Sequence, residues 1–305
     1  MPRRSSASDL HGFLAVDKPA GWTSHDVVAR IRRLTGVRRA GHAGTLDPFA
    51  TGVLVVGVGK ATRLIQYVQQ TAKRYVALVE LGQETDTLDP EGQVVHHRDV
   101  ERWPTLEEVR QVLDGFIGEI EQVPPAHSAI RIQGKRAYER ARAGEAVEIP
   151  ARGVTIHAID ILRYEPPDLE IDVRCGSGTY LRSLARDIGR ELGTYGYCQA
   201  LRRTEVGSFT LATCHTLDEL ERAPLRERWA EIALPPDHAV AHLPAIELSE
   251  AQTTAWYHGQ LIREIRGEQA QATLARAYAA TGDFAGLGEF DPAGGFRPVL
   301  VFTRD

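Results

Sequence analysis

The chain has 305 residues, of which 43% are hydrophobic and 25% are charged. This composition excludes an intrinsically disordered chain, and the length predicts one large and one smaller domain, because a single core rarely organises so many residues. The net charge of −5 argues against a simple polyanion binder, whose affinity would come from an excess of lysine and arginine.

The charge is unevenly distributed along the sequence. Residues 1–80 contain 12 Lys and Arg against 5 Asp and Glu, a net charge of +7, whereas residues 81–305 contain 24 against 36, a net charge of −12. Such asymmetry favours one basic face that could meet phosphates. On composition alone, solvated charge scattered unevenly over the surface is an equally good interpretation.

The N-terminal residues 1–11 include arginines and serines but no apolar run that could form a signal segment, so they are predicted to be a flexible extension. A short apolar strand follows and ends in a turn at Lys18 and Pro19. The next segment predicts a helix, with Ser24 as its N-cap and Gly36 as its stop.

A glycine-rich loop at residues 41–52 then leads into a buried strand, residues 53–59, and a helix at residues 60–70. This strand holds the longest apolar stretch of the chain, which is far too short to cross a membrane. We therefore expect a cytoplasmic protein without a membrane contact.

The middle of the chain mixes strands and helices. Residues 74–92 predict a strand running into a turn, residues 105–120 an amphipathic helix, and residues 169–193 a strand, a glycine-serine loop and a helix. This order favours an α+β fold, with a mixed or antiparallel sheet and flanking helices, over repeated βαβ units. Residues 124–152 are basic and proline-flanked, and are predicted to form an inserted lobe that grips a partner.

The C-terminal part is predicted to be a small β-rich module. Its short strand patterns lie at residues 259–265, 286–290 and 297–302. A proline-bearing stretch precedes them, and we place the boundary near Ala245. Residues 12–245 then form the large domain and residues 246–305 the module.

Asp47 is the first candidate for chemistry, because it lies in the glycine-rich loop directly before a buried strand. An aspartate before a proline more often makes a local turn with its own backbone. The same four residues, Thr-Leu-Asp-Pro, recur at residues 87–90. The local pattern therefore does not decide between Asp47 and Asp89.

A resemblance to a known protein family favours the first Thr-Leu-Asp-Pro copy, which contains Asp47. Residues 41–63, GHAGTLDPFATGVLVVGVGKATR, resemble the signature of the tRNA pseudouridine-55 synthase family. The resemblance continues, in the order of that family, through residues 73–92, 124–145, 178–189 and 200–209. The C-terminal part resembles the PUA-type RNA-binding module found at that end of the family.

The resemblance implies an isomerase that converts uridine 55 in the T-arm of tRNA to pseudouridine without a metal or other cofactor. It implies that Asp47 is the nucleophile, that Tyr75 stacks on the uracil and removes the proton at C5, and that Arg182 pairs with Asp47. It further implies a nucleotide pocket lined by His42, Tyr180 and Leu201.

The chemistry of pseudouridine formation suits these residue types. An ionised aspartate can attack C6 of the uracil or C1′ of the ribose, and the sequence leaves this choice open. The uridine has to be flipped out of folded RNA, and His42 could fill the vacated stack. Without the resemblance, Tyr75 would read as a core strand residue and Arg182 as part of a solvated helix face.

The T-arm stem-loop of tRNA is the expected partner, recognised by shape and phosphates. No obligate protein partner is expected, and the chain is predicted to be a monomer. The predicted RNA-backbone contacts are Lys18, Arg30, Arg33, Arg38, Arg39, Arg131, Lys135 and Arg136.

Other features predict no further site. Cys175, Cys198 and Cys214 form no Cys-x-x-Cys pair for a metal or redox couple, so they read as reduced structural thiols. Two rival functions stay open. A hydrolase would use Asp47 with Asp86 or Asp89 as a carboxylate pair. A non-catalytic RNA chaperone or scaffold would bind tRNA without changing it.

Overall fold

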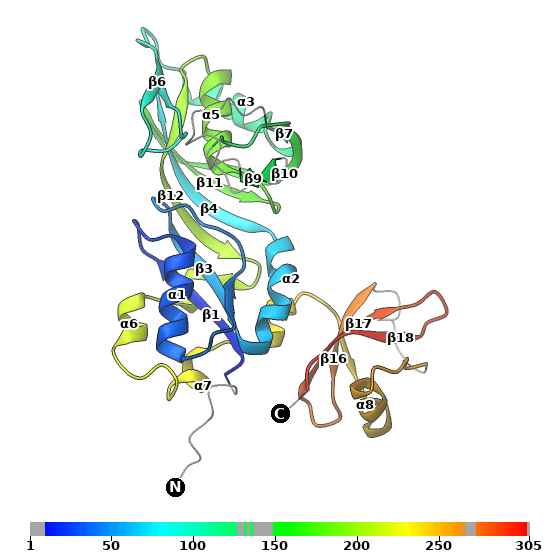
Figure 1. Cartoon of the computed structure of the whole chain (residues 1–305). Helices are drawn as coiled ribbons and strands as arrows, with labels where there is room; N and C mark the ends of the chain where they lie inside the picture. Colours follow the sequence, from blue (N-terminus) through cyan, green and yellow to red (C-terminus); the bar gives the residue numbers. More distant parts are fainter. Residues whose placement is uncertain are drawn as a thin grey trace.

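A computed structural model describes residues 10–126, 131–132, 135–136, 149–263, 265 and 273–303. The larger body is built on a ten-stranded sheet, and a smaller module with its own four-stranded sheet forms the C-terminal part, drawn in orange and red in Figure 1. Among the described residues, no helix is both long and apolar enough to span a membrane.

The large sheet is mixed, as predicted. Its strands are β1 (Gly12–Lys18), β2 (Ala40–His42), β3 (Thr51–Val58), β4 (Lys73–Leu81), β7 (Gly118–Gln122), β10 (Arg152–Glu165), β11 (Asp168–Cys175), β12 (Gly196–Val206), β13 (Phe209–Thr210) and β14 (Cys214–His215). The main order is β14-β1-β3-β12-β4-β11-β10-β7, while β2 pairs with β3 and β13 with β12. Only β1 with β14 and β3 with β12 pair in parallel among these described strands.

Helices and short hairpins complete the larger body. They are α1 (Ser24–Thr35), η1 (Gly59–Leu64), α2 (Ile65–Gln70), β5 (Gln83–Thr85), β6 (Val94–His97), α3 (Leu106–Asp114), β8 (Arg131–Ile132), β9 (Lys135–Arg136), α5 (Leu181–Glu191), η2 (Leu211–Thr213), α6 (Leu217–Glu221), α7 (Trp229–Ile232) and η3 (Pro236–Val240). β5 pairs with β6 and β8 with β9. The apolar stripes of α1 and α5 are buried in one core with the inner side of the sheet.

The helix predicted at residues 105–120 is too long. Helix α3 ends at Asp114, and residues 118–120 already belong to strand β7, which pairs with β10. Gly115 caps α3, Gly118 adopts a positive φ of 109°, and the following residues alternate apolar and charged side chains. A two-residue period suits a strand, and a glycine with positive φ allows the turn that leads into it.

The start of β3 shows how tightly the sheet is packed. Gly52 pairs with Arg203 of β12, has φ +101°, and a Cβ built on it would lie 2.1 Å from the Arg203 carbonyl oxygen. We expect Gly52→Ala to lower the free energy of unfolding by roughly 2–5 kcal/mol, since it adds backbone strain to overpacking. Urea denaturation measures this loss.

Gly282→Ala is the matched control for that substitution. Gly282 has φ +83° but nothing lies within 4 Å of the added Cβ, so only the backbone strain of roughly 1–2 kcal/mol should appear. Equal losses for the two variants would contradict close packing between β3 and β12.

The C-terminal module contains β15 (Ala245–Glu247), α8 (Glu250–Tyr257), β16 (Leu274–Tyr278), β17 (Phe284–Phe290) and β18 (Phe296–Val301), with the sheet order β15-β16-β17-β18. We propose Ala245, where β15 starts, as the domain boundary. The strand patterns at residues 286–290 and 297–302 are confirmed. The pattern at residues 259–265 is wrong as a strand, because its only described pairing is a single bridge between Ile262 and Phe296.

The module is joined to the larger body by contacts from the end of its last strand and from the two residues that follow it. Lys60 Nζ donates to the carbonyl of Thr303 at 2.9 Å, and Arg63 Nη1 donates to that of Val301 at 2.7 Å. Phe302 shares an apolar cluster with residues of the large sheet. These contacts fix the module beside η1.

Candidate active site

A cavity of about 950 Å³ opens at the loop between β2 and β3, residues 43–50. Its wall includes residues from β2, β4, β12 and the start of α5, which are far apart in the sequence. All six residues that the sequence assigned to catalysis and the nucleotide pocket line it: His42, Asp47, Tyr75, Tyr180, Arg182 and Leu201.

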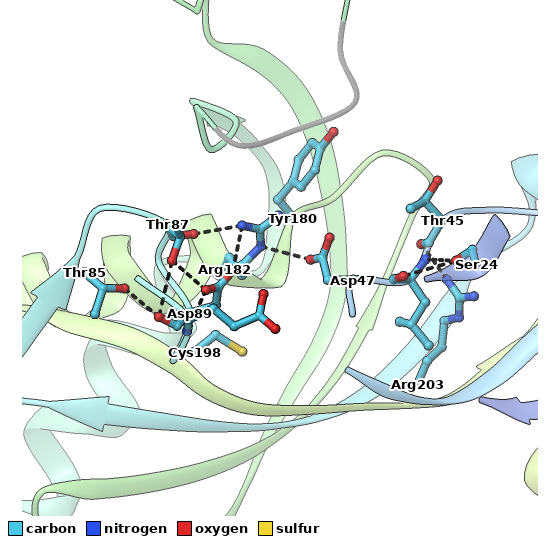
Figure 2. Close-up of polar contacts among 12 residues, drawn as sticks. Ser24, Thr45, Asp47, Thr85, Thr87, Asp89, Tyr180, Arg182, Cys198 and Arg203 are labelled. Atoms are coloured by element: carbon cyan, nitrogen blue, oxygen red, sulfur yellow. Dashed lines mark hydrogen bonds and ion pairs between the residues drawn. The ribbon is translucent and has the colours of Figure 1, made fainter. Parts of the chain in front are cut away.

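A buried guanidinium joins two aspartates at this cavity. The Arg182 side chain is 4% exposed, and its Nε lies 2.9 Å from Asp47 Oδ2. Its Nη1 lies 3.0 Å from Asp89 Oδ2 and donates to the carbonyl of Thr87 at 2.8 Å. Figure 2 shows Arg182 between the two carboxylates. Contacts on both sides leave the guanidinium little freedom to turn.

The two Thr-Leu-Asp-Pro copies therefore meet at one arginine, but their aspartates differ in environment. The side chain of Asp47 is 30% exposed at the cavity, whereas that of Asp89 is 7% exposed. Asp89 also accepts from Thr87 Oγ1 at 2.5 Å and from the Glu91 amide at 3.1 Å. Asp47 is thus the carboxylate that a ligand can reach, and Asp89 is the one that holds the arginine.

The backbone between Thr87 and Asp89 takes an uncommon conformation. Leu88 has φ 61°, in the left-handed region that few residues other than glycine adopt. Its carbonyl accepts from the Cys198 amide at 3.1 Å. This turn brings the Thr87 carbonyl and the Asp89 carboxylate onto the same nitrogen of Arg182, so the local strain lies where the site is built.

Tyr75 and His42 are two of the side chains with rings that line the cavity. Tyr75 comes from β4 and is nearly buried, and burial raises the pKa of its hydroxyl, which keeps it protonated at neutral pH. Burial is also the largest cause that lowers the pKa of His42, so its imidazole is neutral at pH 7. The ring of His25 packs edge-on against that of His42, with 5.3 Å between the ring centres.

Tyr180 and Leu201 complete the wall. Leu201 is buried in β12, and the guanidinium of Arg152 lies 4.9 Å above the centre of the Tyr180 ring. A cation is attracted to the face of an aromatic ring, so this contact favours one orientation of both side chains. Apolar and aromatic side chains therefore line part of the cavity wall, and the Asp47 carboxylate lies in the same wall.

The prediction that Lys18 binds the RNA backbone is wrong. Lys18 is fully buried, and its Nζ donates to the carbonyls of Pro19, Trp22 and Pro48 at 2.9, 2.7 and 3.2 Å. Burial lowers its pKa to about 8. The sequence could not show this, because a lysine beside a turn is usually exposed. Lys18 ties the turn after β1 to the loop that carries Asp47.

The other predicted phosphate contacts stay predictions. Arg30 already pairs with Glu221 at 2.5 Å, and Arg39 Nε donates to Thr62 Oγ1 at 2.8 Å. Arg33 and Arg38 are exposed. The remaining three, Arg131, Lys135 and Arg136, lie in the β8–β9 hairpin, with their side chains outside the described part of the chain.

Arg203 is a site residue that sequence reasoning missed. It is almost fully buried in β12, and its guanidinium donates to the carbonyls of Gly44, Thr45 and Val53 at 3.2, 3.2 and 2.8 Å. It thereby holds the first half of the Asp47 loop against the sheet. No local signal marks this role, since the partners lie about 150 residues away. Asp89 was also missed as a partner of Arg182, although the repeated motif pointed to it.

The described residues contain no group of three or more His, Cys, Asp or Glu side chains arranged to hold a metal ion.

Comparison with known families gives three matches that follow one another along the chain. Residues 32–181 match the TruB family pseudouridylate synthase N-terminal domain, and residues 182–241 match the tRNA pseudouridylate synthase B C-terminal domain. Residues 244–302 match the C-terminal part of pseudouridine synthase II TruB.

Curated proteins and solved structures agree with these matches. The chain is 46% identical to a tRNA pseudouridine synthase B of Arthrobacter sp. (strain FB24), over 96% of this chain and 97% of that protein. It is also 46% identical to one of Thermobifida fusca (strain YX), over 96% and 98%. A structure described as an H/ACA RNP bound to a substrate RNA containing 2'-deoxyuridine gives a TM-score of 0.73 at 26% identity, over 98% of this chain and 86% of that one.

A second solved structure, described as a Cbf5-Nop10-Gar1 complex, gives a TM-score of 0.72 at 28% identity, over all of this chain and 88% of that one.

Proposed function

The chain belongs to the TruB family of pseudouridylate synthases, and on this basis we propose that it isomerises uridine 55 in the T-arm of tRNA to pseudouridine. Its relatives are named tRNA pseudouridine synthase B, which makes tRNA the substrate class and isomerisation the reaction. The observation that carries the proposal is an accessible Asp47 at a cavity, paired with a buried arginine that a second aspartate holds.

Asp47 acts as the nucleophile in this proposal. Its carboxylate adds to C6 of the uracil or C1′ of the ribose, which allows the glycosidic bond at N1 to break. The base then turns within the cavity and C5 bonds to C1′, the bond between Asp47 and the adduct breaks to return the free carboxylate, and the proton on C5 is lost. Arg182 holds the carboxylate in one direction throughout, because its planar fork is itself fixed by Asp89 and Thr87.

The cavity explains how a base inside folded RNA is reached. The uridine is flipped out of its stack into the cavity, at a cost of a few kcal/mol. His42 fills the space that the base leaves, and a neutral ring suits this role because it stacks without a charge to solvate. Tyr180 and Leu201 hold the sides of the extruded nucleotide.

Tyr75 supports the flipped uracil by stacking. Tyr75→Leu removes the ring, and since stacking on a base contributes about 1–3 kcal/mol, KM should rise about fivefold to a hundredfold. Tyr75→Phe keeps the ring and should leave KM near the wild-type value. Initial rates over a range of tRNA concentrations separate the two, and an unchanged KM in Tyr75→Leu would contradict stacking.

Proton removal at C5 by Tyr75 makes a separate pH prediction. Burial raises the pKa of this hydroxyl above 10, so the phenolate is scarce at neutral pH and becomes more abundant as pH rises. If the phenolate is the base and proton removal limits the rate, kcat should increase about tenfold per pH unit between pH 7 and pH 9. A flat profile in single-turnover measurements would remove this role and leave the stacking role intact.

Three different outcomes of one assay separate the isomerase from its two rivals. With tRNA carrying 5-tritiated uridine, an isomerase releases tritium to water and no free base. A hydrolase using Asp47 with Asp86 or Asp89 releases free uracil, and a scaffold releases neither. We expect tritium release alone, and uracil release would overturn the proposal in favour of the hydrolase.

We further propose that the enzyme is a cytoplasmic monomer without an obligate protein partner. The two solved structures above were obtained as complexes, whereas the curated relatives match this chain nearly from end to end as single proteins named for the activity. Sedimentation of the purified chain at working concentration tests the oligomeric state.

A further inference from the structure

Ser24 has a hydroxyl that helix formation does not use. The sequence predicted Ser24 as the N-cap of α1, which is wrong because Thr23 occupies that position. The Thr23 hydroxyl accepts from the Asp26 amide at 3.1 Å, and Asp26 Oδ2 accepts from the Thr23 amide at 3.0 Å. This reciprocal box satisfies the amides of Thr23 and Asp26 without the Ser24 hydroxyl, which is therefore available for another contact.

That contact is with the residue directly before Asp47. Ser24 Oγ accepts from the Leu46 amide at 2.9 Å and donates to the Leu46 carbonyl at 3.1 Å. Ser24 is 2% exposed and Leu46 4% exposed, so both hydrogen bonds are shielded from solvent and losing them would leave buried backbone groups unpaired. Figure 2 shows Ser24 beside the loop that carries Asp47. One hydroxyl therefore fixes both polar groups of the Leu46 backbone.

The rest of the loop is held by other side chains. Arg203 binds the carbonyls of Gly44 and Thr45, and Lys18 binds that of Pro48. These contacts hold the two ends of the segment from Gly44 to Pro48. Ser24 holds its centre, where the backbone enters Asp47 and sets the direction of the carboxylate.

We propose that Ser24 is a positioning residue for the reaction: by clamping Leu46, it aims the Asp47 carboxylate at the reacting carbon opposite Arg182. The inference rests on the proposed function. It follows from the geometry of catalysis, because a displacement of about 1 Å at a nucleophile can cost about a hundredfold in rate even when binding is intact. Ser24 also lines the cavity, but its hydroxyl both donates to and accepts from the Leu46 backbone, so substrate binding should survive its loss.

The test substitutes Ser24→Ala in the full-length protein. Alanine suits the first turn of a helix and nearly matches serine in size, so the fold should be retained. We expect kcat for tritium release to fall about tenfold to a hundredfold, with KM and the Kd for tRNA within about twofold of wild type.

Thr35→Val provides a matched control on the same helix. Thr35 is also fully buried, and its Oγ1 likewise donates to one backbone carbonyl, of Ile31, and accepts from one backbone amide, of Val37. It lies at the far end of α1 from the Asp47 loop. Thr35→Val should lower the melting temperature at least as much as Ser24→Ala does, yet keep the wild-type kcat.

Three outcomes overturn the inference: a wild-type kcat in Ser24→Ala, an equal loss of kcat in both variants, or a loss confined to KM. Failure of the proposed function is distinguishable, because then the wild-type protein itself releases no tritium.

Discussion

Replacing Asp47 by asparagine should lower kcat by about 10⁴-fold or more while tRNA binding stays close to wild type. Asparagine has the same shape but is not an anionic nucleophile, so no covalent intermediate can form. Arg182 keeps its contacts with Asp89 and Thr87, and the site should therefore stay folded. Single-turnover tritium release gives the rate, and filter binding gives the Kd.

Asp86→Asn is the control for this substitution. Asp86 lies in the same hairpin as Asp89, but its Oδ1 accepts from the Gln93 amide instead of contacting Arg182. Wild-type rates are expected for Asp86→Asn. A carboxylate pair formed by Asp47 and Asp86 would require both variants to be inactive, and an active Asp47→Asn would remove the nucleophile from the mechanism.

Arg182→Lys should lower kcat by about a hundredfold or more, with a smaller effect on the Kd for tRNA. Lysine keeps the positive charge, but its single ammonium cannot reproduce the fixed fork that reaches Asp47 through Nε and Asp89 through Nη1. The Asp47 carboxylate then loses its direction. The same tritium-release and binding measurements apply.

Arg190→Lys separates this effect from the general cost of changing an arginine that pairs with a buried carboxylate on the same helix. Arg190 lies on α5 and binds the buried Glu84 through Nε and Nη2, at 2.9 and 2.7 Å. We expect Arg190→Lys to cost stability while preserving kcat. If Arg182→Lys proved as active as Arg190→Lys, then orientation of Asp47 by Arg182 would play no part in the reaction.

The sequence alone predicted six residues that line the cavity, but mainly through the resemblance to a known family. Local pattern left Asp47 and Asp89 equivalent, and the family signature favoured Asp47. The structure adds the physical difference between them. Both aspartates line the cavity, but the Asp47 side chain is 30% exposed, whereas that of Asp89 is 7% exposed and bound by Thr87, Glu91 and Arg182.

Contacts distant in sequence explain what the sequence could not reveal. Arg182 and Asp89 are 93 residues apart, and Arg203 and Thr45 are 158 apart. Periodicity places a residue on one side of its own helix or strand, but it carries no information about which distant carbonyl or carboxylate lies opposite. Lys18 shows the same limit, because its burial follows from the loop that folds over it.

Errors at element ends have local causes. Threonine and serine are both favourable N-cap residues. Thr23 takes the N-cap position of α1 because Asp26, three positions later, completes its capping box. The overlong helix at residues 105–120 continued an apolar pattern past Gly115, where strand pairing with β10 took over.

The most direct test of the central claim is to map pseudouridine by carbodiimide modification and reverse transcription in an unmodified elongator tRNA transcript treated with the purified protein. One new stop, reporting position 55 in the T-loop and missing when Asp47→Asn is used, is the expected result. A stop at a different uridine, or a transcript left unchanged, would contradict it.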